Sequence, residues 1–81
     1  MHDDLRERAH DVDATLRVGK GGIDAVADEL RTQLDDRELV KVKFLRAARG
    51  STTTESLAED LADRVDGEVV ESRGHTAVVH R

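Results

Sequence analysis

The chain has 81 residues and a mass of 8.9 kDa, which suffices for one small hydrophobic core but not for a catalytic domain joined to a cofactor domain. Apolar residues account for 37% and charged residues for 38%, and the absence of cysteine excludes disulfides, thiolate metal sites and cysteine nucleophiles. The formal net charge of −5 disfavours a polyanionic partner unless the basic residues gather in one place.

No stretch of the sequence has the character of a membrane span or a secretory signal. The apolar runs are far shorter than the roughly 18 residues that cross a bilayer. The opening Met1-His2-Asp3-Asp4 lacks the basic and then apolar pattern of a signal peptide. We therefore expect a cytoplasmic protein that does not contact a membrane.

The first half of the chain predicts a helix, a strand, a glycine-rich loop and a second helix. A narrow apolar stripe at helical spacing favours an amphipathic helix over residues 3–12. A short strand is expected at residues 15–18. It runs into Gly19-Lys20-Gly21-Gly22, after which apolar residues at helical spacing predict a helix over residues 23–35.

The clearest strand covers residues 39–45. Three apolar residues there alternate with Lys41 and Lys43, so that one face of the strand meets the core and the other carries positive charge. This local alternation predicts both the strand and the face of the strand that is buried.

The last part of the chain predicts a helix and a hairpin. Thr52 as N-cap and Glu55 three residues later form a capping box. The helix that follows is expected to end at Gly67 as a left-handed stop. The segments 68–72 and 76–80 are two strands whose short connection requires an antiparallel hairpin.

The order of these elements is α-β-α-β-α-β-β, and it predicts the fold class. We expect an α/β sandwich in which the helices pack against a mixed sheet of four strands. The chain has no proline, internal repeat or low-complexity linker, so residues 1–81 are expected to form a single domain.

The glycine-rich loop is the most informative local feature. Its three glycines permit backbone conformations that other residues avoid and let a partner approach closely. Amides at the start of a helix can donate to a phosphate at the positive end of the helix dipole, with Lys20 as a mobile cation. The spacing fits neither the dinucleotide fingerprint nor the NTPase phosphate loop, but it fits the G-x-x-G loop with which KH domains hold a single-stranded backbone. A simple turn between strand and helix is the alternative.

The basic residues are concentrated in one part of the chain. Residues 37–49 hold five basic residues against one acidic residue, whereas residues 50–72 hold one arginine against seven acidic residues. All three lysines lie in the loop or on the strand that follows it, at positions 20, 41 and 43. A solvated strand face is the alternative interpretation, but it does not explain why an acidic protein gathers its few lysines here.

The composition also predicts an environment. Ten of the thirteen basic residues are arginine, and eleven of the eighteen acidic residues are aspartate. An acidic surface with few lysines and almost no aromatic residues is expected of a protein from a high-salt cytoplasm, where net charge keeps protein soluble.

No catalytic or metal-binding constellation is recognisable in the sequence. The four histidines lack helical i, i+4 pairing and thiolate neighbours, which favours surface roles over metal ligation. Ser72 and His75 flank a turn without an acidic residue to orient the histidine, so a hydrolytic triad is not predicted. We expect neither an enzyme nor a bound metal or other cofactor.

Four segments together resemble a known family: residues 16–23 around the loop, residues 38–43 with the sequence E-L-V-K-V-K, residues 61–64, and residues 74–81. In this order, and over nearly the whole chain, they are similar to the CRM domain, the chloroplast RNA splicing and ribosome maturation domain. Its stand-alone prokaryotic members are called YhbY-like proteins. Together with the acidic composition, the resemblance favours a haloarchaeal member.

The resemblance implies an RNA-binding module whose fold is similar to the C-terminal domain of bacterial translation initiation factor three. It implies ribosomal RNA of the large-subunit precursor as the partner, with ribosomal proteins as further candidates. The family's loop and basic strand match four loop residues and two lysines here, and three neighbouring arginines extend the same cationic track. The expected RNA-binding residues are Arg17, Gly19, Lys20, Gly21, Gly22, Lys41, Lys43, Arg46 and Arg49.

A protein-interaction module is the alternative function. In that case the acidic helix before Gly67 and the C-terminal hairpin dock a basic ribosomal protein, and the glycine-rich loop is only a turn. We expect the protein to be a monomer under either function.

Overall fold

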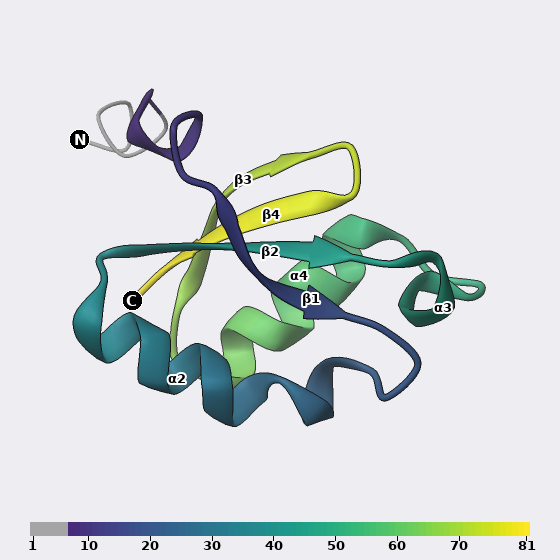
Figure 1. Ribbon diagram of the computed structural model, residues 1–81. Helices are drawn as coiled ribbons and strands as arrows, with labels where there is room; N and C mark the ends of the chain where they lie inside the picture. Colours follow the sequence, from purple (N-terminus) through teal and green to yellow (C-terminus); the bar gives the residue numbers. More distant parts are fainter. Residues whose placement is uncertain (1–6) are drawn as a thin grey trace.

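The computed structural model describes residues 7–81, and Figure 1 shows their arrangement. Residues 7–9 form a helical turn and residues 10–13 leave the helix, so the first helix ends earlier than expected. The part of that helix expected over residues 3–6 lies outside the described residues.

Four strands form one mixed sheet in the order β1-β2-β4-β3. Strand β1 (Ala14–Val18) pairs in parallel with β2 (Leu39–Phe44), and β4 (Thr76–His80) lies antiparallel between β2 and β3 (Glu68–Arg73). The predicted α/β class, the four-stranded mixed sheet and the C-terminal hairpin are confirmed, with strand ends within one residue of expectation.

The two longer helices, α2 (Ala27–Asp36) and α4 (Thr54–Arg64), cover the same side of the sheet (Figure 1). Strand β2 turns Val40, Val42 and Phe44 toward them, and each of these side chains is at most 1% exposed. Burial of one face of an alternating strand supplies the main hydrophobic stabilisation, at roughly 1.5 to 3 kcal/mol for each large side chain.

The segment predicted as one helix from residue 23 consists of two elements. A 3₁₀ turn, η1 (Ile23–Ala25), comes first, and α2 begins after Val26. The Val26 amide donates to the Ile23 carbonyl at 3.1 Å, and both side chains pack against the core. Residues i and i+3 eclipse in a 3₁₀ helix, so the tighter turn keeps these two side chains on the sheet.

The start of α4 differs from the expected capping box. Thr53, rather than Thr52, is the N-cap, and its Oγ1 accepts a hydrogen bond from the Ser56 amide at 3.1 Å. Thr52 donates its own amide to the Arg49 carbonyl at 2.7 Å, which ties it to the turn before the helix. That turn follows α3 (Arg46–Arg49), a one-turn helix that the sequence did not predict.

The end of α4 also corrects an expectation. Asp66, with φ of 57°, is the left-handed residue, and Gly67 is not. The Gly67 amide donates to the Ala62 carbonyl at 2.8 Å, as in a Schellman motif. A Cβ at residue 67 would lie 2.8 Å from the His80 carbonyl oxygen, so glycine is required there by close packing against β4.

The sheet has a second, smaller apolar cluster on its other side, which we call the outer face because it is turned away from α2 and α4. Ala9 from the N-terminal turn packs there with Leu39, Val70 and Val78, and Val12 covers their margin. The N-terminal turn therefore covers the end of the outer face where β2 begins, and leaves the end where β2 finishes uncovered.

Candidate nucleic-acid interface

Three connections meet where β1 and β2 end, at a place that we call the loop edge (Figure 1). Parallel strands finish at the same edge, so the loop 19–22 after β1 lies beside the segment after β2. The Leu45 amide donates to the Val18 carbonyl at 2.8 Å. The Phe44 amide donates to the His75 carbonyl at 2.7 Å, which adds the turn of the β3–β4 hairpin to the same edge.

A row of polar residues crosses the outer face beside the loop edge. In the sheet register, Arg17 lies next to Lys43, Lys43 faces Thr76, and Thr76 faces Arg73. The strand neighbours of Arg17, Lys43 and Thr76 point into the core, so these side chains point outward, and Arg73 points the same way because it is paired with Thr76. Strands lie about 4.8 Å apart, so this cationic row (Arg17, Lys43, Thr76 and Arg73) spans about 14 Å.

The cationic side chains predicted from the sequence have no acidic partners within residues 7–81. They are Arg17, Lys20, Lys41, Lys43, Arg46 and Arg49. Most arginines outside the loop edge are neutralised by a carboxylate. The ion pairs are Arg8–Glu38 (2.6 Å), His10–Glu71 (3.2 Å), Arg31–Asp28 (2.6 Å), Arg64–Asp24 and Arg81–Asp35 (3.3 Å). The unneutralised cations give the loop edge a positive potential on a protein that is acidic overall.

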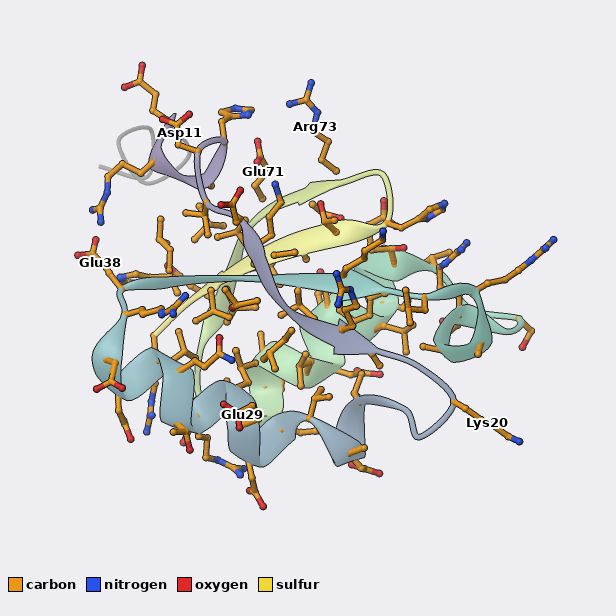
Figure 2. All side chains as sticks on the ribbon, viewed as in Figure 1. Asp11, Lys20, Glu29, Glu38, Glu71 and Arg73 are labelled. Carbon is orange, nitrogen blue, oxygen red and sulfur yellow. The ribbon has the colours of Figure 1, made fainter. Side chains whose placement is uncertain are left out.

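The predicted cationic side chains differ in their exposure and in their hydrogen bonds. Most are exposed, and Lys20 projects from the tip of the loop (Figure 2). Lys41 is half-buried and lies further from the loop edge, in register with Val78. The Arg49 Nε donates to the Phe44 carbonyl at 3.2 Å, so this guanidinium also holds the turn after β2.

The loop itself presents free backbone donors. The Gly22 amide donates to the Gly19 carbonyl at 3.0 Å and closes the loop as a turn. The amides of Lys20 and Gly21 at its tip donate to no residue within 7–81. The expected contribution of a helix dipole is wrong in part, because the loop leads into the three-residue turn η1 and α2 starts only after Val26.

Arg73 could not be placed from the sequence, and the structure puts it at the end of the cationic row. It projects from the hairpin (Figure 2), and its Nη1 lies 3.2 Å from Nδ1 of His10. The other ring nitrogen of His10, Nε2, lies 3.2 Å from Oε1 of Glu71. No local pattern identifies Arg73, because its position depends on the pairing of β3 with β4.

The described residues form neither a metal-binding cluster nor a membrane-spanning helix. Within residues 7–81, no three His, Asp or Glu side chains gather in a group that could hold a metal ion. None of the helices in this part of the chain is long and apolar enough to cross a membrane.

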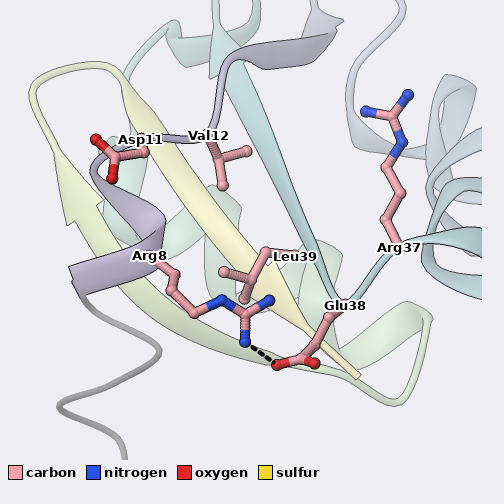
Figure 3. Close-up of a pocket in the computed structure, with 6 residues that line it drawn as sticks. All are labelled: Arg8, Asp11, Val12, Arg37, Glu38 and Leu39. Atoms are coloured by element: carbon pink, nitrogen blue, oxygen red, sulfur yellow. Dashed lines mark hydrogen bonds and ion pairs between the residues drawn. The ribbon is translucent and has the colours of Figure 1, made fainter.

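A hollow of about 440 Å³ lies at the opposite end of the sheet (Figure 3). It lies between the N-terminal turn and the start of β2, and the Arg8–Glu38 ion pair lies on its wall. Its lining residues are Arg8, Asp11, Val12, Arg37, Glu38 and Leu39. Leu39 begins the strand whose other end meets the loop edge, so the hollow is separate from the candidate interface.

The model of the CRS1/YhbY (CRM) domain family matches residues 2–81. A protein of Methanocaldococcus jannaschii named as a probable RNA-binding protein is 39% identical over 77 residues, which are 95% of this chain and 58% of that protein. A protein of Bacillus subtilis with the same description is 31% identical over 78 residues, which are 95% of this chain and 79% of that protein. The chain thus spans little more than half of the archaeal relative and most of the bacterial one.

A solved structure supports the same conclusion. The solution structure of a hypothetical protein from Staphylococcus aureus superposes with a TM-score of 0.82 at 32% identity, covering 99% of this chain and 82% of that one. The expected fold and the family resemblance are therefore confirmed, and the family is non-enzymatic, as predicted for this chain. From the motif order, the fold and the match over residues 2–81, we conclude that the chain belongs to the CRS1/YhbY (CRM) domain family.

Proposed function

We propose that residues 1–81 act as one RNA-binding domain that holds RNA phosphates at the loop edge and on the adjoining outer face. The observation that carries this proposal is the set of cations without acidic partners within residues 7–81, gathered beside a loop with free amides. The names of the two curated relatives, both described as probable RNA-binding proteins, support it.

Each part of the site has a distinct chemical role. The amides of Lys20 and Gly21 donate to phosphate oxygens, and the absence of side chains on the glycines lets the backbone approach. Lys20, Arg17 and Lys43 supply charge, while Arg46 and Arg49 extend the cationic surface beyond β2. Because affinity of this kind comes from phosphate neutralisation, it falls as salt rises.

The natural RNA in this proposal is ribosomal RNA of the large-subunit precursor, bound during ribosome assembly. The family resemblance supports this partner. The same proposal has the protein bind RNA in a cytoplasm of concentrated salt. Such salt screens charges to within a few ångströms, so only close contacts remain effective, and the amides of the loop can make such contacts. Circular dichroism at low and multimolar KCl tests the salt adaptation, and a fold indifferent to KCl would contradict it.

The decisive experiment compares Lys20→Ala with Arg37→Ala. Each substitution removes one exposed positive charge that forms no ion pair with a residue within 7–81. Arg37, however, lies at the end of α2, away from the loop edge. We expect Lys20→Ala to weaken RNA binding roughly threefold to tenfold and Arg37→Ala to change it little.

The same pair of variants serves in cells. Crosslinking and sequencing of bound RNA should recover large-subunit ribosomal RNA with the native chain and with Arg37→Ala, and less with Lys20→Ala. No RNA above background from the native chain would contradict the proposed function, and equal recovery from both variants would contradict the proposed site.

A further inference from the structure

We infer that the loop edge and the cationic row bind base-paired RNA in preference to single-stranded RNA. This inference rests on the proposed function and names the class of RNA that the surface fits. The competing ligand is a single strand held at the G-x-x-G loop alone, as in KH domains.

The surface offers almost nothing on which bases can stack. Phe44 is the one Phe, Tyr or Trp in the chain, and it is 1% exposed within the core. Among the described residues, the rings at this surface are the imidazoles of His75, on the hairpin turn, and of His10, which contacts Arg73 at the end of the cationic row. Proteins that bind single strands obtain roughly 1 to 3 kcal/mol for each base that stacks on an aromatic side chain, and no Phe, Tyr or Trp supplies such stacking here.

The surface also lacks amide side chains that read base edges. The chain has no asparagine, and its one glutamine, Gln33, is engaged. Its Oε1 accepts from the Thr15 hydroxyl at 2.5 Å, and its Nε2 donates to Glu29 Oε2 at 3.3 Å. The Thr76 hydroxyl hydrogen is likewise directed into the hairpin, to the Arg73 carbonyl at 2.8 Å. The free groups that remain are mainly cations and backbone amides, which contact phosphates and sugar hydroxyls.

The arrangement of these cations suits a rigid ligand. The cationic row is built on paired strands, and the hydrogen bond between Arg73 and His10 at 3.2 Å orients its outermost guanidinium. Base-paired RNA presents phosphates that are already ordered, whereas a single strand must lose conformational entropy to follow a row about 14 Å long. Base-paired RNA is recognised mainly by its shape and by contacts to phosphates and 2′-hydroxyls.

Fluorescence anisotropy of the full chain with two RNAs tests the inference. One probe is a blunt duplex of twenty base pairs, and the other is one of its strands, chosen so that it cannot fold on itself. We expect the duplex to bind at least about tenfold more tightly. Equal or tighter binding of the strand overturns the inference while leaving the proposed function intact, and binding of neither RNA overturns both.

A second measurement tests whether the sheet face takes part. Arg73→Ala should weaken duplex binding roughly fivefold and lower the slope of log K against log salt by about 0.9, the value for one phosphate contact on a double helix. Arg37→Ala, with the same change in charge, should leave both quantities nearly unchanged. If Arg73→Ala leaves the duplex affinity and slope intact while Lys20→Ala reduces them, the cationic row is not in contact and the inference is overturned.

Discussion

The fold constrains the three glycines of the loop to different degrees. Gly22 has φ of 74° and ψ of −176°, a conformation that other residues rarely adopt. Gly21 leaves room for Ala25, whose Cβ would lie 3.1 Å from a Cβ at residue 21. Gly19 has neither constraint, because an added Cβ would meet only Leu45 Cδ1 at an ordinary 3.7 Å. The fold therefore does not require glycine at position 19.

This difference predicts that a substitution at Gly19 affects RNA binding, whereas one at Gly22 affects stability. Gly19→Ala should leave the melting temperature nearly unchanged and weaken RNA binding roughly threefold to tenfold, because a methyl group separates the backbone from the phosphate. Gly22→Ala should lower the free energy of unfolding by about 1 to 3 kcal/mol. Thermal denaturation and anisotropy on both variants check this. Undiminished RNA binding by Gly19→Ala would show that the loop backbone is not approached closely.

At the scale of secondary structure, the helix ends depend on which hydrogen bonds the neighbouring turn leaves available. Thr52, Thr53 and Thr54 are adjacent and chemically alike, yet only Thr53 caps α4. The Thr52 amide is held by the turn after α3, and Thr54 is 5% exposed within the first turn of the helix. The sequence pattern predicted Thr52 as the N-cap, and packing of the preceding turn selected Thr53 instead.

The corrected N-cap can be measured directly. Thr53→Ala should reduce the free energy of unfolding by about 1 kcal/mol, because the Ser56 amide loses its acceptor at the helix start. The neighbouring Thr52→Ala is the control and should cost only a few tenths of a kcal/mol, as is usual for an exposed surface substitution. Urea denaturation of both variants compares the two positions. A larger loss from Thr52→Ala would support the capping box that the sequence alone predicts.

At the scale of the whole molecule, the cationic row and the acidic residues of α4 lie on different layers. The cationic row faces away from the helices, whereas α4 carries Glu55, Glu59 and Asp63 on its exposed side without ion pairs to other described residues. An acidic chain can therefore present a positive surface to a polyanion, because the sheet separates the two sets of charges. The alternative of a docked basic protein places its partner on the acidic layer.

Reversing the charge of α4 discriminates between the two functions. The triple variant Glu55→Lys, Glu59→Lys and Asp63→Lys should bind RNA at least as tightly as the native chain, because these residues lie on the layer opposite the cationic row. Circular dichroism confirms that the variant is folded, and anisotropy measures its affinity for RNA. If the folded variant loses a basic protein partner that the native chain captures, the docking function is supported. If it loses RNA, the RNA contacts α4.

Local periodicity in the sequence determined much of the fold. The alternation in β2, the apolar spacing in α2 and α4, and the short link between β3 and β4 each involve neighbours along the chain, so each was readable in advance. The G-x-x-G loop and the cluster of lysines were readable for the same reason. The break at Val26 and the left-handed Asp66 could not be predicted in the same way. The first depends on packing of Ile23 and Val26 against the core, and the second on the close approach of the next residue, Gly67, to β4.

Tertiary structure alone decided how the candidate site is assembled. Arg17, Lys43 and Arg73 come from strands far apart in the sequence, and they share one row only because β1, β2, β4 and β3 pair in a particular register. A shift of one residue in any pairing would turn a whole strand over, and no local pattern states which register is adopted. The sequence by itself determined which strand carries the lysines. The pairing of distant strands decided which arginines join them, because register is set by burial of the common core rather than by neighbours along the chain.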